Sequence, residues 1–556
     1  MKRTLGLALL LLTIMVASVF PHLSLNNAVA DDSYPVVNRS TGLTYLTIQS
    51  AIDAPLTSDG NIILVKKGTC TENITINKSI VLVGEDRDQT IIDGNQTRTV
   101  IRVIASGVLI QNVTVKNGIT GIFVDHSNNT QIIGSNVVNC IPDKTMVFYE
   151  FQQGIRVQYS FNCVIRNSVI ANNAVTGVLI TDSSNFTVSS NQVYRNGNSS
   201  YSYGLNTNAS SYGLIAYNNV YENKWDNIGL GYGSTNCTIL GNNVTGYTLF
   251  GMWVDYGSDG NIFYGNNIVN NVIAAQPVNV LSQWDSGIEG NYWGNYFTAN
   301  NTDTNYDGIG DSSYGIDINN TDRFPLMGRF HSFFTYKNQV VDVITNSGTD
   351  NFAFFRSNNT IKIHVSSMAP DQTEDFCRIR IPHSLMIEPY SVTVDGVEPS
   401  YVNYTVNDDE TSRWIYFRYS HSTHGISISG AQPPDTIPPA ISVLSPENVV
   451  YVQDAIPLIF VTDEETSWIG YSLDKLENTP ISDNVTLSGL LDGLHEITVY
   501  ANDTAGNRGS SEAIFFTVKA QTGLPTILWV SIATLLIPAL GGLAILAYKR
   551  LKKQNG

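Results

Sequence analysis

The hydrophobic and polar positions between Gly121 and Asn271 repeat one pattern several times. Each repeat runs from glycine through alternating apolar residues to serine, and then through a second alternation to asparagine. Aligning the repeats gives a serine column at Ser127, Ser160, Ser183, Ser210, Ser234 and Ser258, with steps of 33, 23, 27, 24 and 24 residues. A period in the twenties that is built from short period-2 runs and turn residues is typical of stacked β-strands. The pattern therefore predicts a β-solenoid in which one repeat forms one coil.

Two further columns follow from the same alignment. The asparagine column contains Asn167, Asn191, Asn218, Asn242 and Asn266, and an aliphatic column two residues further on contains Val169, Val193, Val220, Val244 and Ile268. In a solenoid, equivalent side chains of neighbouring coils stack at the strand spacing of roughly 4.8 Å. We therefore expect the aliphatic column in the core. We expect the asparagines to hydrogen-bond along the axis at the bends and so pair buried backbone groups.

The segment before the repeats, residues 34–118, contains one short helical pattern followed by strand-like runs. The helical pattern is TIQSAIDAPL, residues 47–56, and its apolar residues Ile48, Ala51, Ile52 and Leu56 lie on one side. A helix across the first coil would cover the open edge of the sheets, which an uncapped solenoid exposes. We therefore expect this helix to be the N-terminal cap.

The repeat pattern ends before Phe330, and two other β-rich regions follow. Residues 330–431 contain alternating runs such as TIKIHVSS and WIYFRYSHS, which predict an antiparallel β-sandwich. The proline-rich stretch 432–439 reads as a stiff linker. Residues 435–519 contain a second set of strand patterns that resembles the immunoglobulin-like modules of surface proteins. We expect both regions to form a stalk.

The two ends of the chain carry targeting patterns. Residues 1–30 have a basic start, an apolar run and small residues at the end, which is the pattern of a secretory signal peptide. Residues 524–548 form an apolar stretch long enough to cross a bilayer of roughly 30 Å. The basic residues at 549–556 mark the cytoplasmic side. We therefore expect a cell-surface protein with its body outside the cell and a single C-terminal membrane helix.

Composition agrees with an exported surface. About seventeen Asn-x-Ser/Thr sequons are present, among them those at Asn38, Asn73, Asn77, Asn95, Asn112, Asn185, Asn236, Asn243, Asn403, Asn484 and Asn502. Sequons of this kind are sugar acceptors in exported proteins. The net charge of −17 with only 14% charged residues describes an acidic surface that argues against nucleic acid as a partner.

The start and the close of the solenoid resemble a known family. The opening TIQSAIDAPL…ILVKKGTCTENITINKSIVLVGEDRDQTIIDGN and the closing WDSGIEGNYWGNY…DTNYDGIGDSSYGIDINNTDRFPLM, residues 284–327, resemble the NosD-like right-handed parallel β-helix proteins of archaeal cell surfaces. The resemblance covers residues 36–328. It implies a right-handed parallel β-helix and, from the namesake of the group, a role in copper supply.

The residues themselves do not support copper. Copper delivery needs clustered Met, Cys or His, whereas the 7 Met and 8 His of this chain are scattered. His421 and His424 form the one close histidine pair, and they lie at a spacing that places them on opposite faces of a strand unless a turn intervenes.

The predicted fold class is all-β. The predicted domains are a signal peptide at 1–30, a right-handed parallel β-helix at 31–328, a β-sandwich at 330–431, an immunoglobulin-like β-sandwich at 435–519, a transmembrane helix at 524–548 and a basic tail at 549–556. The five cysteines, Cys70, Cys140, Cys163, Cys237 and Cys377, are expected to be buried thiols. Cys163 and Cys237 occupy one column three coils apart, roughly 14 Å, which is too far for a disulfide.

Carbohydrate is the ligand class that the exposed chemistry of the solenoid favours. Tyrosine and tryptophan are frequent in the middle and late coils, and such rings stack on sugars while nearby Asn and Asp bond to hydroxyls. The predicted contacts are Asp125, Asp182, Trp253, Asp255 and Tyr256, with an inserted loop at 146–153 beside them. A carbohydrate-active enzyme is the first alternative. The three carboxylates are offset in register and separated by at least one coil, which disfavours paired acid–base chemistry.

A calcium site is predicted in the closing segment. Asp303, Asn305, Asp307 and Asp311 in DTNYDGIGD match positions 1, 3, 5 and 9 of an EF-hand-like loop, and Ile309 would supply a backbone carbonyl at position 7. Tyr314 stands at position 12 where the full motif has glutamate, so Asp317 or Asp322 would have to replace that ligand.

Together these patterns favour a membrane-anchored surface protein for adhesion or polysaccharide binding. The alternatives are a carbohydrate-active β-helix lyase, hydrolase or epimerase, and a NosD-like copper accessory protein.

Overall fold

A computed structural model describes residues 35–141, 152–198, 202–246, 248–296, 302–336, 339–368 and 374–519 of the 556. The chain divides into two compact units, Met1–Gln432 and Pro433–Gly556. The predicted signal peptide at 1–30, membrane helix at 524–548 and basic tail at 549–556 lie outside the described residues. Within the described ranges, no helix has both the length and the hydropathy needed to span a bilayer.

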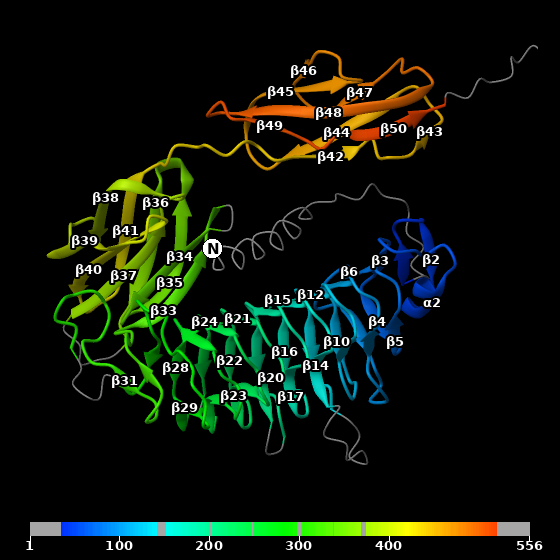
Figure 1. Cartoon of the computed structure of the whole chain (residues 1–556). Coiled ribbons are helices and arrows are strands. Elements are labelled where there is room, and N and C mark those ends of the chain that lie inside the picture. The colour runs from blue at the N-terminus through cyan, green and yellow to red at the C-terminus, as the bar shows by residue number, and fades with distance from the viewer. Residues whose placement is uncertain are drawn as a thin grey trace, which may run out of the picture. The chain divides into compact units, whose positions relative to one another are not determined.

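The first unit contains a β-solenoid of three sheets, in which the chain passes from sheet A to sheet B to sheet C in each coil (Figure 1). Sheet A consists of β1 (Val36–Asn38), β2 (Leu43–Tyr45), β3 (Ile62–Val65), β6 (Val81–Gly84), β9 (Leu109–Gln111), β12 (Gln131–Ile133), β15 (Val164–Arg166), β18 (Thr187–Ser189), β21 (Leu214–Ala216), β24 (Thr238–Leu240) and β27 (Ile262–Tyr264). Sheet B consists of β4 (Gly68–Thr71), β7 (Thr90–Asp93), β10 (Thr114–Lys116), β13 (Asn136–Val138), β16 (Val169–Ala171), β19 (Gln192–Tyr194), β22 (Asn219–Tyr221), β25 (Asn243–Thr245), β28 (Asn267–Val269) and β30 (Tyr292–Trp293). Sheet C consists of β5 (Ile74–Ile76), β8 (Ile101–Val103), β11 (Ile122–Asp125), β14 (Gln153–Gln158), β17 (Thr176–Thr181), β20 (Tyr203–Asn208), β23 (Asp226–Gly231), β26 (Phe250–Val254) and β29 (Ile273–Pro277).

The coil strands pair in parallel with the same strands of the coils before and after, and the inward-facing Ile, Val and Leu form one continuous core. Only the entry to the solenoid departs from this rule, because β1 pairs with both β2 and β3 in the antiparallel sense. The predicted solenoid is therefore confirmed.

The predicted serine column is a hydrogen-bonded ladder at the corner between sheets C and A. The backbone N–H of Ser160 donates to the hydroxyl of Ser183, and that of Ser183 donates to the hydroxyl of Ser210, at 3.1 and 3.2 Å. The same bond links each of the other neighbouring members from Ser127 to Ser258. The hydroxyls thus pair backbone donors that the stacking would otherwise bury unpaired.

The predicted asparagine column is confirmed from Asn191 onward and is wrong at its first member. Each ladder asparagine accepts from the N–H of the equivalent residue one coil earlier, but Asn191 accepts from Ser168 and not from Asn167. Ile170 accordingly pairs with Val193 and is fully buried. Asn167 instead occupies a left-handed bend with φ of 54°, a conformation that asparagine tolerates. The sequence alignment was one residue out of step in this coil.

A second asparagine ladder, not predicted from the sequence, lies at the corner between sheets B and C. It contains Asn173, Asn196, Asn223 and Asn271, and each of these side chains lies against a glycine at the start of a sheet C strand. A Cβ atom at Gly204 would stand 2.4 Å from the Asn223 amide nitrogen, so the ladder excludes any side chain there.

Asn227 repairs a gap in this second ladder. The chain has Tyr247, which is outside the described residues, where the next ladder asparagine would fall. Asn227 takes the glycine position of its own coil and is fully buried. Its Oδ1 accepts from Asn223 at 2.9 Å, and its Nδ2 donates to the Thr245 carbonyl and to the Asn271 Oδ1 at 2.9 and 3.1 Å. One side chain therefore spans the missing step.

The N-terminal cap is confirmed as the short helix α2 (Ile48–Asp53), which contacts β1, β2, β3 and β5. Thr47 caps it, because its side chain accepts from the Ser50 N–H. Ile48, Ala51 and Ile52 are buried as expected. Leu56 is 65% exposed, contrary to the prediction, because the helix ends before Pro55.

The closing segment covers the last coil through buried polar contacts. Asp322 accepts from the Asn291 N–H and from the Trp293 indole N–H at 2.7 and 2.8 Å. Burial raises the pKa of Asp322 to about 6, although these hydrogen bonds lower it. The Asp322 carboxylate fills the space beside Gly290, where no Cβ would fit. The short strands β31 (Tyr314–Gly315) and β32 (Thr321–Asp322) hold this segment.

Residues 329–431 form two antiparallel sheets that share one buried core. The five-stranded sheet contains β33 (Arg329–Phe334), β34 (Val340–Thr345), β37 (Glu374–Pro382), β39 (Tyr401–Asp408) and β40 (Ser412–Ser420). The four-stranded sheet contains β35 (Gly348–Phe355), β36 (Thr360–Ser366), β38 (Ile387–Val394) and β41 (His424–Ala431), with the 3-10 turn η4 (Arg356–Asn358) between β35 and β36. Glu289 joins this region to the solenoid, because its Oε1 accepts from the Trp414 indole and from Arg378 at 2.8 and 3.0 Å in a buried setting.

The second unit contains two further sheets around its own core. One contains β42 (Ile441–Ser445), β44 (Ile456–Thr462) and β47 (Val485–Leu487). The other contains β43 (Val450–Tyr451), β45 (Thr466–Leu473), β46 (Thr479–Ile481), β48 (Gly493–Asp503), β49 (Arg508–Ser510) and β50 (Ile514–Val518). The pairing is antiparallel except between β43 and β50.

The prediction of five buried thiols is confirmed. None of the cysteines, all of which lie in the described residues, forms a disulfide, and all are buried. Burial raises the pKa of Cys163 and of Cys237 to about 11, and it raises the pKa of the other three thiols as well.

We predict that Asn227→Gly destabilises the protein even though glycine occupies the same position in neighbouring coils. The change leaves Asn223 and Asn271 without their buried partner, at a cost of roughly 2–5 kcal/mol in the free energy of unfolding. Chemical denaturation of the purified protein measures this loss. Asn77→Gly, at an exposed position, controls for the added backbone freedom, and equal midpoints for the two variants would contradict the ladder repair.

Candidate functional site

The outer face of sheet C and the corner after it carry the residues that the sequence singles out. Two rows of side chains face outward along sheet C, one containing Arg102, Phe123, Arg156, Leu179, Asn206, Gly229, Trp253 and Gln276, the other containing Asp125, Gln158, Thr181, Asn208 and Gly231. One residue further on, the chain turns at a corner column of His126, Tyr159, Asp182, Ala209 and Tyr232, all with φ between 47° and 51°. The buried serine ladder follows directly.

The first coils of this face hold an ion-paired cluster. Asp125 accepts from Arg102 at 2.7 Å and contacts the His126 Nδ1 at 2.7 Å. Burial raises the pKa of Asp125, but the hydrogen bonds and charges of Arg102 and His126 outweigh it and hold the pKa below its ordinary value. Asp125 is therefore a fixed anion. The Tyr159 ring stacks at a tilt on His126, with centroids 4.7 Å apart.

The middle coils of the same face are uncharged. Asn206 donates to Asn208 at 3.2 Å on β20. No side chain stands at Gly229 in the next coil, because the Tyr203 ring and the Asn206 amide oxygen fill that space. Trp253 follows one coil later and packs against Phe250, with ring centroids 4.8 Å apart. This stretch offers amides beside aromatic rings.

The three predicted acidic contacts lie far from one another, as the sequence indicates. Asp125 is level with Gln158 and Thr181, so Asp182 lies two coils away and one residue out of register. At roughly 4.8 Å a coil the separation is about 10 Å. Asp255 lies three coils beyond Asp182, at about 14 Å. Paired carboxylates of glycosidases stand about 5–9.5 Å apart, so these residues are not arranged as such a pair.

The corner between sheets C and A carries several tyrosines with large exposed fractions, although aromatic rings are usually buried in a folded protein. Tyr159, Tyr232 and Tyr256 are 49%, 75% and 73% exposed, and Tyr212 at the same corner is 64% exposed. Tyr232 and Tyr256 belong to successive coils, since β23 pairs with β26. The rings therefore form a discontinuous row along the axis. The predicted inserted loop at 146–153 lies mostly outside the described residues, and its last residue, Gln153, begins β14.

Asp226 is a buried carboxyl group that the sequence analysis missed. It begins β23 between Tyr203 and Phe250 of the neighbouring coils, and both of its oxygens are buried without a hydrogen-bond partner. Burial raises the pKa of Asp226 to about 8, from 3.8. Among the described residues it is the only carboxylate with buried, unpaired oxygens. Since neither oxygen reaches the surface, Asp226 cannot contact a ligand in this structure. In the sequence, Asp226 could have been recognised only as a polar residue at a strand position where the neighbouring coils have the aromatic residues Tyr203 and Phe250.

The predicted calcium loop satisfies its own polar groups. The two oxygens of Asp303 accept from the Asp307 and Gly308 N–H groups at 3.0 and 2.9 Å, and Asp307 accepts from the Ile309 N–H and the Asn305 amide at 2.8 and 3.0 Å.

Asp311 accepts from Thr302 and Thr304 at the other end of the loop. Asp317 bonds to Asn319 and Asn320, while Asp322 is buried in the closing segment, so neither is directed to position 12 by these contacts. Calcium binding here stays a prediction.

The second unit brings three carboxylates together without a sequence prediction. Oxygens of Asp435, Glu464 and Asp503 all lie within 4.8 Å of one another, the only such group in the described part of the chain. Asn507 donates to Asp503 through its backbone and its side chain.

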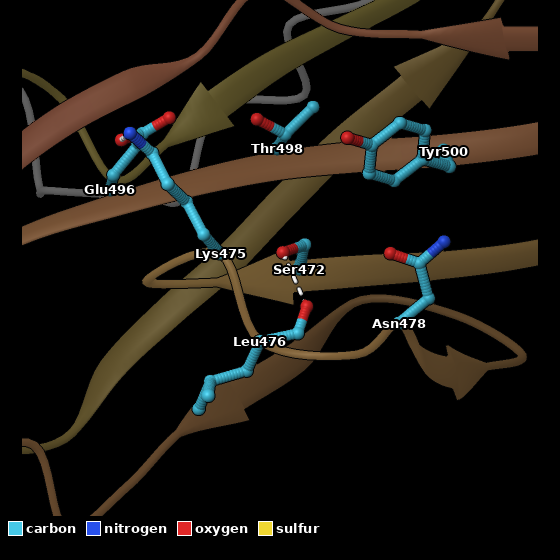
Figure 2. A pocket seen from close by; sticks show the side chains of 7 residues that line it. All are labelled: Ser472, Lys475, Leu476, Asn478, Glu496, Thr498 and Tyr500. Carbon is cyan, nitrogen blue, oxygen red and sulfur yellow. Dashed lines mark hydrogen bonds and ion pairs between the residues drawn. The ribbon is translucent and has the colours of Figure 1, made fainter.

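A separate polar cavity of about 270 Å³ lies over β45 and β48 of the second unit (Figure 2). Lys475 approaches Glu496 to 3.3 Å at its rim.

The close histidine pair does not converge. A turn does separate His421 from His424, but the Nδ1 of His421 bonds to Asp375 at 2.9 Å and that of His424 bonds to Asp395 at 2.7 Å. The two imidazoles thus serve different carboxylates.

We predict that Asp226→Asn removes part of the pH dependence of stability. A carboxyl group whose pKa is raised by folding favours the folded state below its unfolded pKa of 3.8, and that advantage is lost as pH rises through about 8. In thermal melting, the stability of the variant relative to the natural protein should therefore rise from pH 4 to about pH 8 and level off above that pH. A difference that is constant over this range would contradict the assignment.

If the closing loop binds calcium, Asp303→Asn should abolish the binding heat of a site with a dissociation constant on the order of 10⁻⁴ to 10⁻³ M. Calorimetry with Ca²⁺ measures it, and Asp503→Asn is the matched control in the other acidic group. Loss of heat in the Asp503 variant alone would place the ion in the second unit. Unchanged heats in both variants would exclude both sites.

Comparison with known proteins agrees with this architecture. Residues 99–268 match the family described as "Right handed beta helix region". The "Cell surface glycoprotein" of Methanothermus fervidus is 26% identical over 295 residues, which cover 48% of this chain and 49% of that protein, so the chain spans about half the length of this relative.

Two crystal structures resemble part of this chain at low similarity. Pectate lyase Pel9A has a TM-score of 0.32 at 15% identity, covering 44% of this chain and 76% of that one. An alginate lyase from Paenibacillus sp. str. FPU-7 has a TM-score of 0.30 at 15% identity, covering 42% and 94%. The chain thus contains a right-handed β-helix region and is distantly related to an archaeal cell surface glycoprotein.

Proposed function

We propose that this chain is a cell-surface protein whose β-helix binds polysaccharide along the corner column and the outer face of sheet C. The observation that carries the proposal is the row of exposed tyrosines at that corner, with Tyr232 and Tyr256 about three-quarters exposed on successive coils. The relation to a cell surface glycoprotein supports the location.

Exposed rings on successive coils, as at Tyr232 and Tyr256, suit an extended sugar chain. A tyrosine presents an apolar face for the C–H groups of a sugar and a hydroxyl for its polar edge. The amide of Asn208 and the carboxylate of Asp182 lie on the same side of the coils and can bond to sugar hydroxyls. Asn206 is buried and donates to Asn208, which it holds in place. The ligand would be a neutral or weakly charged polymer, because Arg102 is paired with Asp125 and the chain is acidic overall.

Binding is favoured over catalysis by the positions of the carboxylates. Asp125 is an ion-paired anion, and Asp182 is about two coils away. Asp226 has the raised pKa of an acid catalyst but no access to solvent. Glycoside hydrolysis needs an acid and a second carboxylate facing one bond. A lyase or epimerase stays the alternative if a base and a neutralising cation meet on this face.

The remaining regions fit a stalk. The two sheets at 329–431 follow the solenoid directly and are joined to it at Glu289. The sheets of the second unit, which end at residue 519, come before the apolar stretch 524–548 in the sequence. We propose that they hold the β-helix away from a membrane in which residues 524–548 are inserted. A copper accessory role has less support, because His421 and His424 are held by separate carboxylates.

Replacing Tyr232 and Tyr256 with alanine should weaken polysaccharide binding at least about tenfold, since each stacked ring contributes on the order of 1 kcal/mol. A glycan array probed with the purified protein identifies the ligand, and titration calorimetry then compares the variants. Tyr194→Ala with Tyr221→Ala is the matched control, because these rings stack on each other on sheet B, 4.9 Å apart.

Equal affinity in the corner variant and the natural protein would contradict the proposed face. Shortening of the bound polymer, or the appearance of unsaturated sugar ends, would favour the enzyme alternative. Loss of binding in the sheet B control alone would move the site to the opposite side of the coils.

A further inference from the structure

The β-helix places chemically similar sequons in opposite environments. The sequons at Asn185, Asn236 and Asn243 all have an apolar middle residue and end in threonine. Their local sequence therefore does not distinguish them as sugar acceptors. Their positions in the coil do.

Asn185 and Asn236 stand at the outer bend of the corner between sheets C and A. Both are exposed, and both adopt the left-handed conformation with φ of 54° and 56°. They occupy equivalent places two coils apart, roughly 10 Å along the axis. Neither side chain forms a hydrogen bond within the described residues. Each amide nitrogen therefore faces solvent and loses no internal contact when it is substituted.

Asn243 lies inside the stack. It begins β25 and is half-buried, and its Nδ2 donates to the Asn219 Oδ1 of the preceding coil at 2.8 Å. Its neighbours above and below in sheet B are Asn219 and Asn267. A sugar on this nitrogen would have to fit between rungs that are roughly 4.8 Å apart and would break the bond to Asn219.

Asn38 is more strongly excluded. It is fully buried beside the N-terminal cap, and its Nδ2 donates to the Thr57 hydroxyl and the Asn61 amide oxygen at 2.9 and 3.0 Å. No glycan can be accommodated at this nitrogen while the cap is formed.

We propose that Asn185 and Asn236 carry N-linked glycans in the mature protein and that Asn38 and Asn243 do not. The donor would be an oligosaccharide bonded through its anomeric carbon to a lipid-carried phosphate. The asparagine amide nitrogen forms the new bond to the anomeric carbon, the bond from that carbon to the phosphate oxygen breaks, the phosphate leaves with the electron pair, and the amide proton passes to solvent. No electron is transferred.

The two glycans would stand beside the corner column but would not belong to it. In the chain, Asp182 and Tyr232 come after their sheet C strands and before the buried serines Ser183 and Ser234, whereas the two asparagines come after those serines. Tyr212 lies level with the two asparagines, in the coil between them. The two proposals still rest on different observations and are tested by different measurements, so either can fail without the other.

The test is a glycopeptide map by tandem mass spectrometry of the full-length protein purified from the cells that produce it. Peptides with Asn185 and Asn236 should carry the sugar in most copies, and those with Asn38 and Asn243 should be unmodified. Asn185→Gln and Asn236→Gln should each remove one glycan from the intact mass, while Asn243→Gln should leave the glycan mass unchanged.

Unmodified Asn185 and Asn236 would overturn the proposal, as would a sugar on Asn243 or Asn38. Thermal melting of each variant shows whether it folds. If a variant does not fold, the glycopeptide map of the natural protein decides the question by itself. The polysaccharide titration of the glycosylated natural protein reports separately on the corner tyrosines.

Discussion

The pairing of buried backbone groups at the coil corners is the constraint on which the β-helix depends. Strands pair with the coils above and below them, but each corner leaves N–H and C=O groups inside the stack with no strand partner. Serine hydroxyls fill this role between sheets C and A, and asparagine amides fill it at the other two corners. Because the ladders have one rung per coil, they also set the register of the strands between them.

This constraint separates the residues that the fold needs from those it leaves open. The core positions and nearly all ladder positions are buried, with Asn271 at the end of its ladder only partly so. The corner column, by contrast, tolerates histidine, tyrosine, aspartate or alanine in the same left-handed turn. Nothing in the stacking requires a ring at Tyr232 or Tyr256. Their exposure is therefore more informative about ligands than the core is, and the same reasoning separates exposed sequons from buried ones.

Several features of the fold could be predicted from the residue patterns of the sequence alone. The serine steps located every rung from Ser127 to Ser258, and the apolar side of α2 identified the cap. The sequence alignment wrongly placed Asn167 in the ladder in place of Ser168, because asparagine suits both a ladder position and a left-handed bend. Asn227 and Asp226 were not recognised, since each departs from its column and has meaning only through side chains in neighbouring coils.

The sequence by itself determined the coil period, the inward and outward alternation and the separation of the acidic residues, because these follow from local periodicity and a constant axial rise. Tertiary structure alone decided the unpaired burial of Asp226, the meeting of Asp435, Glu464 and Asp503, and the join at Glu289. These contacts link residues tens to more than a hundred positions apart, where no short-range pattern records proximity. Exposure, hydrogen bonding and pKa depend on those neighbours, so the chemistry of the site required the fold.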